Sequence, residues 1–224
     1  MLPSASPVPV IVDLVHSRRI VARSAMQVQI EETFRFVNER VPASQPIRPT
    51  IGDELQGVFG TVAAALEATM LARLALPTSI DCRFGIGRGA IETVGEGMSG
   101  HLQDGPGWWL AREAIDEAHS RENGRNPTLR SWFRAQSDEN AASGGRTVLW
   151  EESLVNAYLL TRDHIISAMN DRARRVTLGI ALGRSQRELA SDENVSQSAI
   201  SQTMRKSGGS SLLSSLDTLK RGAL

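Results

Sequence analysis

Residues 50–59, with the sequence Thr-Ile-Gly-Asp-Glu-Leu-Gln-Gly-Val-Phe, decide the fold class of this chain. Two short apolar pieces flank a Gly-Asp pair, which is typical of a tight β-hairpin with Asp53 at or near its tip. Residues 8–15 are apolar and β-branched, and we expect them to form a buried strand. A second strand is expected at 80–91. The hairpin would then supply the middle pair of strands in one sheet.

Helices are expected between these strands. Residues 21–40 place apolar side chains at helical spacing, and prolines between 42 and 49 predict a loop after them. Residues 61–76 are rich in Ala, Leu and Met and end before Pro77, which predicts a second helix. The resulting order, βαββαβ, is typical of a ferredoxin-like antiparallel sheet backed by helices, so the fold class expected is α+β.

The strand at 80–91 has an unusual glycine pattern. Gly85, Gly87 and Gly89 occupy every second position and therefore share one face of the sheet. Such a bare face either receives a closely packed helix or leaves room for a ligand, and on the second alternative Gly85 and Gly87 would contact a nucleotide.

After this strand the chain becomes mainly helical. A helix is expected at 105–119, a long irregular insertion with a short helix around Trp132 at 120–146, and a last short strand at 148–150. Helical periodicity dominates from residue 151 onward. We therefore expect a sheet domain at 1–150 and an all-α domain at 151–224.

Charge differs between the two ends of the chain. The 224 residues carry 25 Lys and Arg and 25 Asp and Glu, which excludes a strongly basic nucleic-acid coat. Residues 171–224 hold nine basic and five acidic residues, a net of +4, and residues 1–170 hold sixteen and twenty, a net of −4. A basic end suggests nucleic-acid binding, although this difference is small.

The most specific pattern lies at 186–205. A short helix beginning near Ser185 carries Leu189 and Ala190, a turn follows at 192–194, and an apolar residue comes directly after the turn. The next helix begins at Ser196, a plausible N-cap, and repeats small and apolar residues on one face. This arrangement is typical of a helix-turn-helix.

The second helix of such a unit meets base edges in DNA, and flanking basic residues bind phosphates. The competing interpretation is a helical hairpin used for packing or dimerisation, but buried interfaces rarely hold so many polar side chains. Helix-turn-helix proteins usually bind paired half-sites, so we expect a homodimer. The residues expected to contact DNA are Ser196, Gln197, Ser198, Ser201 and Gln202, with Arg187, Arg205 and Lys206 on the backbone.

Acidic residues mark the N-terminal strands. Asp13 ends the first strand, and Asp53 and Glu54 lie in the hairpin, so adjacent strands could bring them together. Carboxylate oxygens suit Mg²⁺ or Mn²⁺, which could bridge nucleotide phosphates. The alternative is ordinary: Asp13 caps a turn and Asp53 is a common turn residue.

Four blocks resemble one bacterial family. VDLVHSRR at 12–19, TIGDELQG at 50–57, RFGIGRGAI at 83–91 and DGPGWWLAREAI at 104–115 are similar in order and spacing to the SatD family, and the resemblance extends over nearly the whole chain. The same blocks are more distantly similar to class III nucleotide cyclases, and more loosely to diguanylate cyclases.

The cyclase resemblance implies that Asp13 and Asp53 bind metal. It also implies that Arg112 acts on the reacting nucleotide, whereas Trp108 stands where those enzymes carry an asparagine. Arg18 and Arg19, in the loop after the first strand, would bind phosphates or remain solvated.

Other site chemistries and locations find little support. Cys82 is the single cysteine, and we expect it to be a small buried side chain. The four histidines are not spaced as metal ligands. No P-loop or G-x-S-x-G occurs, and no apolar stretch is long enough for a membrane span. Residues 1–9 lack signal-peptide features, so a cytoplasmic location is expected.

Two functions follow from these patterns. The first is a DNA-binding transcription regulator whose N-terminal domain binds a nucleotide or divalent metal, or serves for dimerisation. The second is a metal-dependent nucleotidyl-transfer or cyclase-type enzyme that uses Asp13, Asp53 and Arg112. A third, a pseudoenzyme acting through protein contacts of the segment 120–146, also stays open.

Overall fold

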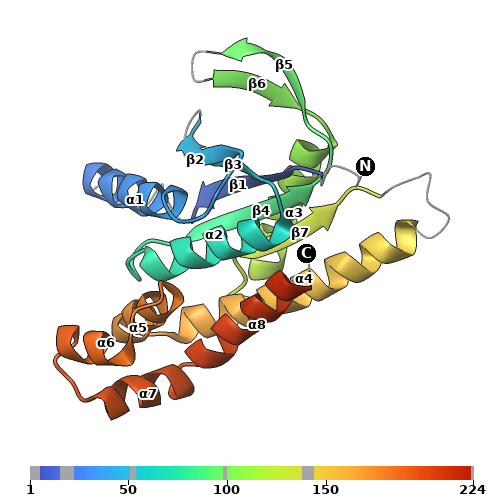
Figure 1. Ribbon diagram of the computed structural model, residues 1–224. Coiled ribbons are helices and arrows are strands. Elements are labelled where there is room, and N and C mark those ends of the chain that lie inside the picture. The colour runs from blue at the N-terminus through green and yellow to red at the C-terminus, as the bar shows by residue number, and fades with distance from the viewer. Residues whose placement is uncertain (1–5, 16–22, 51–53, 98–99, 138–143, 223–224) are drawn as a thin grey trace.

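The chain forms an α+β structure with a mixed five-stranded sheet, as expected for the fold class (Figure 1). The computed structural model describes residues 6–15, 23–50, 54–97, 100–137 and 144–222. The strands of the sheet are β1 (Val8–Leu14), β2 (Gln45–Pro49), β3 (Leu55–Phe59), β4 (Cys82–Arg88) and β7 (Ser131–Ala135). A separate antiparallel ribbon consists of β5 (Glu92–Gly97) and β6 (Gly100–Asp104).

The sheet has the strand order β2-β3-β1-β4-β7. β1 lies at its centre and pairs antiparallel with both β3 and β4, and β3 pairs antiparallel with β2. β7 is added parallel to β4 at the other edge. Of the hairpin strands, β3 lies beside β1 as predicted, whereas β2 forms the edge of the sheet and ends before the predicted first arm of the hairpin.

Helices cover both faces of this sheet. The helices are α1 (Arg23–Asn38), α2 (Val62–Ala75), α3 (Pro106–Glu122), α4 (Gly144–Ala168), α5 (Asp171–Ala181), α6 (Gln186–Asp192), α7 (Gln197–Lys206) and α8 (Gly209–Arg221). Side chains alternate along β1, so Val10 and Val12 join the core under α1 and α2, whereas Ile11 packs against α3 on the other face. The main core also includes residues of α4 and α8.

The glycine face of β4 receives α3. A Cβ atom at Gly85 would lie 2.1 Å from the carbonyl oxygen of Ala111, and one at Gly87 would lie 2.3 Å from that of Gly107. The helix backbone therefore rests directly on the strand. Of the two alternatives for this face, close helix packing is the one that the structure has, and it leaves no room for a nucleotide at Gly85 and Gly87.

Two predicted loops contain strands. The proline loop at 42–49 contains β2, an edge strand on which prolines are tolerated. The insertion at 120–146 contains the end of α3 and all of β7, so Trp132 lies in a strand rather than in a helix. The prediction of a strand at 148–150 is wrong, because these residues belong to α4. The ribbon β5–β6 was not predicted.

Side chains of α4 fasten this helix to the edge of the sheet. Asn156 accepts a hydrogen bond from the backbone N–H of Phe133 at 2.9 Å and donates one to the carbonyl oxygen of the same residue at 3.0 Å. Glu152 accepts from the N–H of Ala135 at 2.8 Å. The predicted domain boundary at residue 150 therefore falls inside a continuous helix whose following turns pack on β7.

Candidate functional site

α6 and α7 are both capped by serine. Ser185 accepts a hydrogen bond from the N–H of Glu188 at 3.2 Å, and Glu188 in return accepts from the N–H of Ser185 at 2.7 Å, which completes a capping box. Ser196 caps α7 by accepting from the N–H of Ala199 at 3.2 Å. Between the helices, Asn194 adopts a left-handed conformation with φ 52°, which turns the chain.

A small hydrophobic core unites α5, α6 and α7. Its buried members are Val176, Leu189, Ala190, Ile200 and Met204, and the half-buried Val195 packs against them. The polar face of α7 points away from this core. Gln197, Ser198 and Gln202 are exposed, and Ser201 is half-buried. The residues of α7 predicted to contact bases therefore lie on the side of this helix that faces away from the core.

The arginines around this surface differ in their partners. Arg175 donates two hydrogen bonds to Glu193 at 2.7 and 2.8 Å, and these bonds lower the pKa of the Glu193 carboxyl. Arg184 pairs with Asp192. The side chains of Arg187, Arg205 and Lys206 are exposed and form no ion pair with any described residue.

Part of the predicted acidic site is brought together on the α3 face of the sheet. The β1–β3 register pairs Val12 with Leu55, so the next step places Asp13 beside Glu54. Glu54 forms an ion pair with Arg112 at 2.6 Å and accepts a hydrogen bond from Gln56 at 2.7 Å. Asp53, Arg18 and Arg19 lie outside the described residues.

The carboxylates found here already have cationic partners. Arg83 donates to Asp13 at 3.0 Å, just as Arg112 pairs with Glu54. Among the described residues, no group of three His, Cys, Asp or Glu side chains could hold a metal ion. Asp13 and Glu54 are thus ion-paired, and with Asp53 outside the described residues the Mg²⁺ or Mn²⁺ site stays a prediction.

A groove of about 440 Å³ opens next to Arg112. Trp108 packs its indole against Ile11, Ala111 and Ile115, and its Nε1 is buried without a hydrogen-bond partner among the described residues. The groove is lined by Ile11, Gln56, Gln103, Trp108, Trp109, Arg112 and Glu113. It offers aromatic walls, two amides, the Glu113 carboxylate and the Arg112 guanidinium, which also pairs with Glu54.

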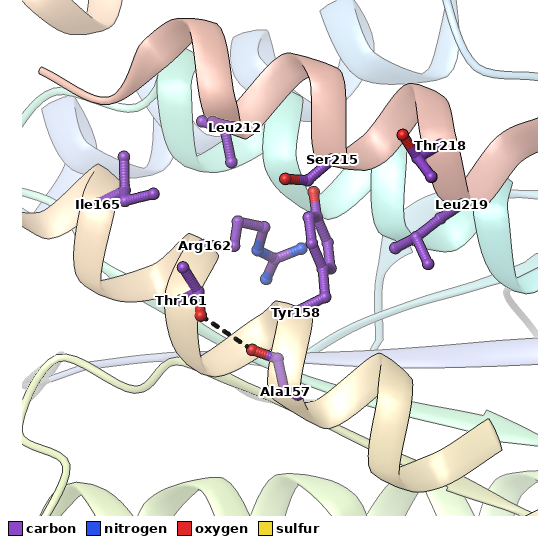
Figure 2. A pocket seen from close by; sticks show the side chains of 9 residues that line it. All are labelled: Ala157, Tyr158, Thr161, Arg162, Ile165, Leu212, Ser215, Thr218 and Leu219. Atoms are coloured by element: carbon purple, nitrogen blue, oxygen red, sulfur yellow. Dashed lines mark hydrogen bonds between the residues drawn. The ribbon is translucent and has the colours of Figure 1, made fainter. Parts of the chain in front are cut away.

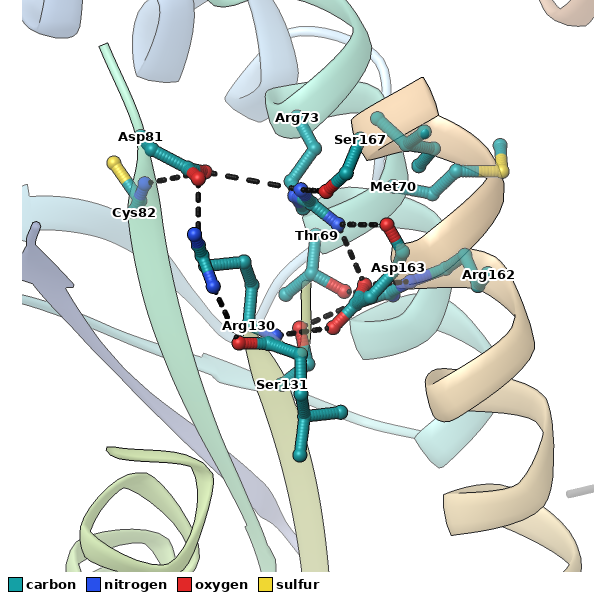
Figure 3. A network of polar contacts seen from close by, with 12 residues as sticks. Thr69, Met70, Arg73, Asp81, Cys82, Arg130, Ser131, Arg162, Asp163 and Ser167 are labelled. Carbon is teal, nitrogen blue, oxygen red and sulfur yellow. Dashed lines mark hydrogen bonds and ion pairs between the residues drawn. The ribbon is translucent and has the colours of Figure 1, made fainter. Parts of the chain in front are cut away.

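A buried ionic network was missed by sequence reasoning (Figure 3). Asp163 is fully buried on α4 and pairs with Arg73 and Arg162, each at 2.9 Å. It also accepts from the N–H of Arg130 at 2.7 Å. Burial raises the pKa of Asp163, but the two guanidiniums outweigh burial and hold it below its ordinary value. The sequence signal for this network is the presence of charged residues within otherwise apolar helical segments.

This network extends to the acidic site. Arg130 pairs with Asp81 and, at 3.2 Å, with Glu122. Glu122 in turn pairs at 2.6 Å with Arg83, the partner of Asp13. Because Arg73, a partner of Asp163, also lies 3.8 Å from Asp81, charges of alternating sign connect α4 to the end of β1.

Comparisons with known proteins locate the chain among its relatives. No curated protein matches it. None of the helices within the described ranges combines the length and hydropathy that crossing a membrane requires. The family model described as "SatD family (SatD)" matches residues 8–143, from β1 to the segment before α4. This match covers more than half of the chain, and the protein therefore belongs to the SatD family.

Proposed function

We propose that this protein is a DNA-binding transcription regulator in which α6 and α7 form a helix-turn-helix. The observation that carries the proposal is the surface of α7. Ile200 and Met204 turn into the core shared with α5 and α6, whereas Gln197 and Gln202 face solvent. A helix that uses one face for packing and leaves amides on the other is suited to reading base edges.

Electrostatics supports the same function. Arg187, Arg205 and Lys206 have no acidic partner among the described residues, so their charge is available to phosphates. Asp192 and Glu193, which would repel DNA, are paired with Arg184 and Arg175. The unpaired charge near α7 that remains for a ligand is therefore mainly that of Arg187, Arg205 and Lys206.

The N-terminal domain is proposed to be a ferredoxin-like, cyclase-related scaffold. The order β2-β3-β1-β4, with antiparallel neighbours throughout, supports this. Its role is to hold two copies of the chain together or to bind a nucleotide. A homodimer would present two copies of α7 to paired half-sites.

DNA binding can be tested with sequences selected from a random pool. We expect tight binding to a selected sequence, with an affinity that falls steeply as salt rises, because each phosphate contact contributes about 0.9 to the slope of log K against log salt. Arg205→Gln should reduce this slope by about one and weaken binding to all sequences. Gln197→Ala should cost about 1–3 kcal/mol and relax the preference at one base.

The matched control is Arg125→Gln, which makes the same change at an exposed arginine in the sheet domain. It should leave the slope unchanged. Flat binding between low and high salt, or equal effects of Arg205→Gln and Arg125→Gln, would contradict the proposed interface.

The groove at Arg112 favours a second candidate function, nucleotide binding with or without turnover. Asp13, Glu54 and Arg112 lie near this groove, whose tryptophans could stack on a base. This function predicts that a nucleoside triphosphate with Mg²⁺ raises the thermal unfolding temperature, and that Arg112→Gln abolishes the increase whereas Arg125→Gln does not. No stabilisation by any of the four nucleotides would exclude it.

Turnover would be visible as a new product by mass spectrometry after incubation with each triphosphate and Mg²⁺ or Mn²⁺. A product that disappears in the Asp53→Ala variant would make the protein an enzyme. Binding without a product would leave this site as a sensor for the DNA-binding domain.

A further inference from the structure

An exposed apolar stripe runs along α4. Trp150 and Leu154 are 67% and 40% exposed, and Ala157 and Thr161 continue the same side of the helix at spacings of three and four residues. Such spacing places side chains on one seam of a helix. The four residues 150, 154, 157 and 161, called the α4 stripe below, contain no charge.

Large apolar side chains are concentrated at this place. Among the described residues, seven large hydrophobic side chains are exposed, and three of them, Leu149, Trp150 and Leu154, fall within two turns of α4. The other four are separated along the chain, on other elements or in a turn. Single exposed apolar residues are ordinary, but a cluster that includes an indole marks an interaction surface.

A groove of about 400 Å³ lies farther along the same helix, between α4 and α8 (Figure 2). Its walls include Tyr158, Ile165, Leu212 and Leu219 and are mostly apolar. Ala157 and Thr161 belong both to this groove and to the α4 stripe. The groove is therefore a continuation of the stripe.

The Tyr158 hydroxyl group is one of several polar groups in the groove. Tyr158 is a buried residue, and its only described hydrogen-bond contact is a weak one to the Sδ atom of Met70 at 4.0 Å. Figure 2 shows this hydroxyl pointing toward Ser215 on α8. Burial raises its pKa to about 12, so the group stays a neutral donor.

The positions of the indole and the groove suit a twofold axis. In a twofold interface, residue i of one copy contacts residue j of the other, and j contacts i. Two antiparallel α4 helices, with the axis passing between Leu154 and Ala157, place residue 150 of each copy opposite residue 161 of the other. Each Trp150 would then reach the groove of the other copy, so the twofold axis generates two identical contacts.

The two acidic residues next to Trp150 do not oppose this pairing. Glu151 and Glu152, next to Trp150 in sequence, turn toward the sheet and pair with Arg88 and Arg134. Like charges would otherwise face each other across a twofold axis, because the same residues approach from both copies.

From these observations we propose that two copies of this chain associate through antiparallel α4 helices, with Trp150 of each copy inserted into the groove between α4 and α8 of the other. This inference deepens the proposed function, since it names the surface that would pair two helix-turn-helix units. It also stands apart from DNA binding, because the association requires no DNA.

The first test measures molar mass by light scattering over a range of protein concentrations without DNA. We expect a dimer for the native chain, and at least a tenfold weaker association for Trp150→Ser and for Ala157→Glu. Trp109→Ser is the matched control, because Trp109 is also exposed, at 57%, but lies on α3. It should remain dimeric.

A monomer at all concentrations would overturn the proposal, and so would a dimer that Trp150→Ser and Trp109→Ser leave equally intact. Neither result would bear on the helix-turn-helix, whose affinity for DNA is measured separately.

The second test uses cross-linking and does not depend on weakening the dimer. Cys82 is fully buried, so a cysteine introduced at the surface is the only reactive thiol. Ala157→Cys, close to the proposed axis, should cross-link to a dimer with a short bismaleimide. Trp109→Cys should stay monomeric on a denaturing gel. Cross-linking of Trp109→Cys but not of Ala157→Cys would place the interface elsewhere.

Discussion

Replacement of Asp163 by alanine is expected to reduce the free energy of unfolding by about 3–5 kcal/mol. The carboxylate is fully buried and is shared by the guanidiniums of Arg73 and Arg162. Without it, two buried cations face each other, Arg73 keeps only the more distant carboxylate of Asp81 at 3.8 Å, and the N–H of Arg130 loses its acceptor. The loss of stability comes mainly from leaving these buried polar groups without partners, rather than from losing the attraction of an ion pair.

Urea denaturation of Asp163→Ala and Asp192→Ala provides the measurement and its control. Asp192 also pairs with an arginine, Arg184, but both side chains are largely exposed, so its loss should cost less than about 1 kcal/mol. Equal losses for the two variants would show that burial does not decide the strength of the Asp163 network.

The same variant should change how stability responds to acid. The pKa of Asp163 is lower in the folded chain than the ordinary value of about 3.9. Its stabilising effect is therefore complete above that value and is lost as the pH falls toward the folded-state pKa. Below about pH 4, the native protein should lose stability more steeply than Asp163→Ala does.

The second large effect is expected at Gly85. Gly85→Ala should destabilise the protein by about 3 kcal/mol, the upper end of the range for overpacking. The added methyl group would lie 2.1 Å from the carbonyl oxygen of Ala111 and 2.7 Å from the backbone N of Ile115. These are backbone atoms of α3 and cannot move aside by rotating a side chain, so the whole helix must shift away from β4.

Gly60→Ala is the control for this effect, because a Cβ atom there meets no atom within 4 Å. Its midpoint in urea should change by little, and the slope of unfolding should be the same in both variants. A native-like midpoint for Gly85→Ala would mean that α3 does not rest on β4 as closely as the structure shows.

The parts of the fold that were predictable have strong local patterns. β1, α2 and α3 carry continuous or periodic apolar residues, and each lies close to its predicted position. β2 was missed because it is an edge strand with two prolines and only Ile47 buried. β7 was missed because its pairing with β4, more than 40 residues earlier, has no local signature.

The candidate site was predictable only to the extent that sequence patterns mark it. The cap at Ser196 and the inward face of α7 follow from side-chain spacing, and Glu54 lies in the quoted hairpin block. The arginine partners of Asp13 and Asp163 were not predictable. The pairs Asp13–Arg83 and Asp163–Arg73 join residues 70 and 90 positions apart, so they form only once the sheet and helices have assembled.

The way α4 fastens to β7 bears on how the protein is made. During synthesis the five strands of the sheet leave the ribosome before Glu152 and Asn156 do, so for that interval the N–H and C=O groups of Phe133 and the N–H group of Ala135 are open to strands of other nascent chains. At the opposite edge, Pro46 and Pro49 of β2 have no N–H group to donate, so this edge is protected from pairing as soon as it forms. In the nascent chain the β7 edge of the sheet is therefore the edge open to aggregation, and α4 covers it once this helix has been synthesised.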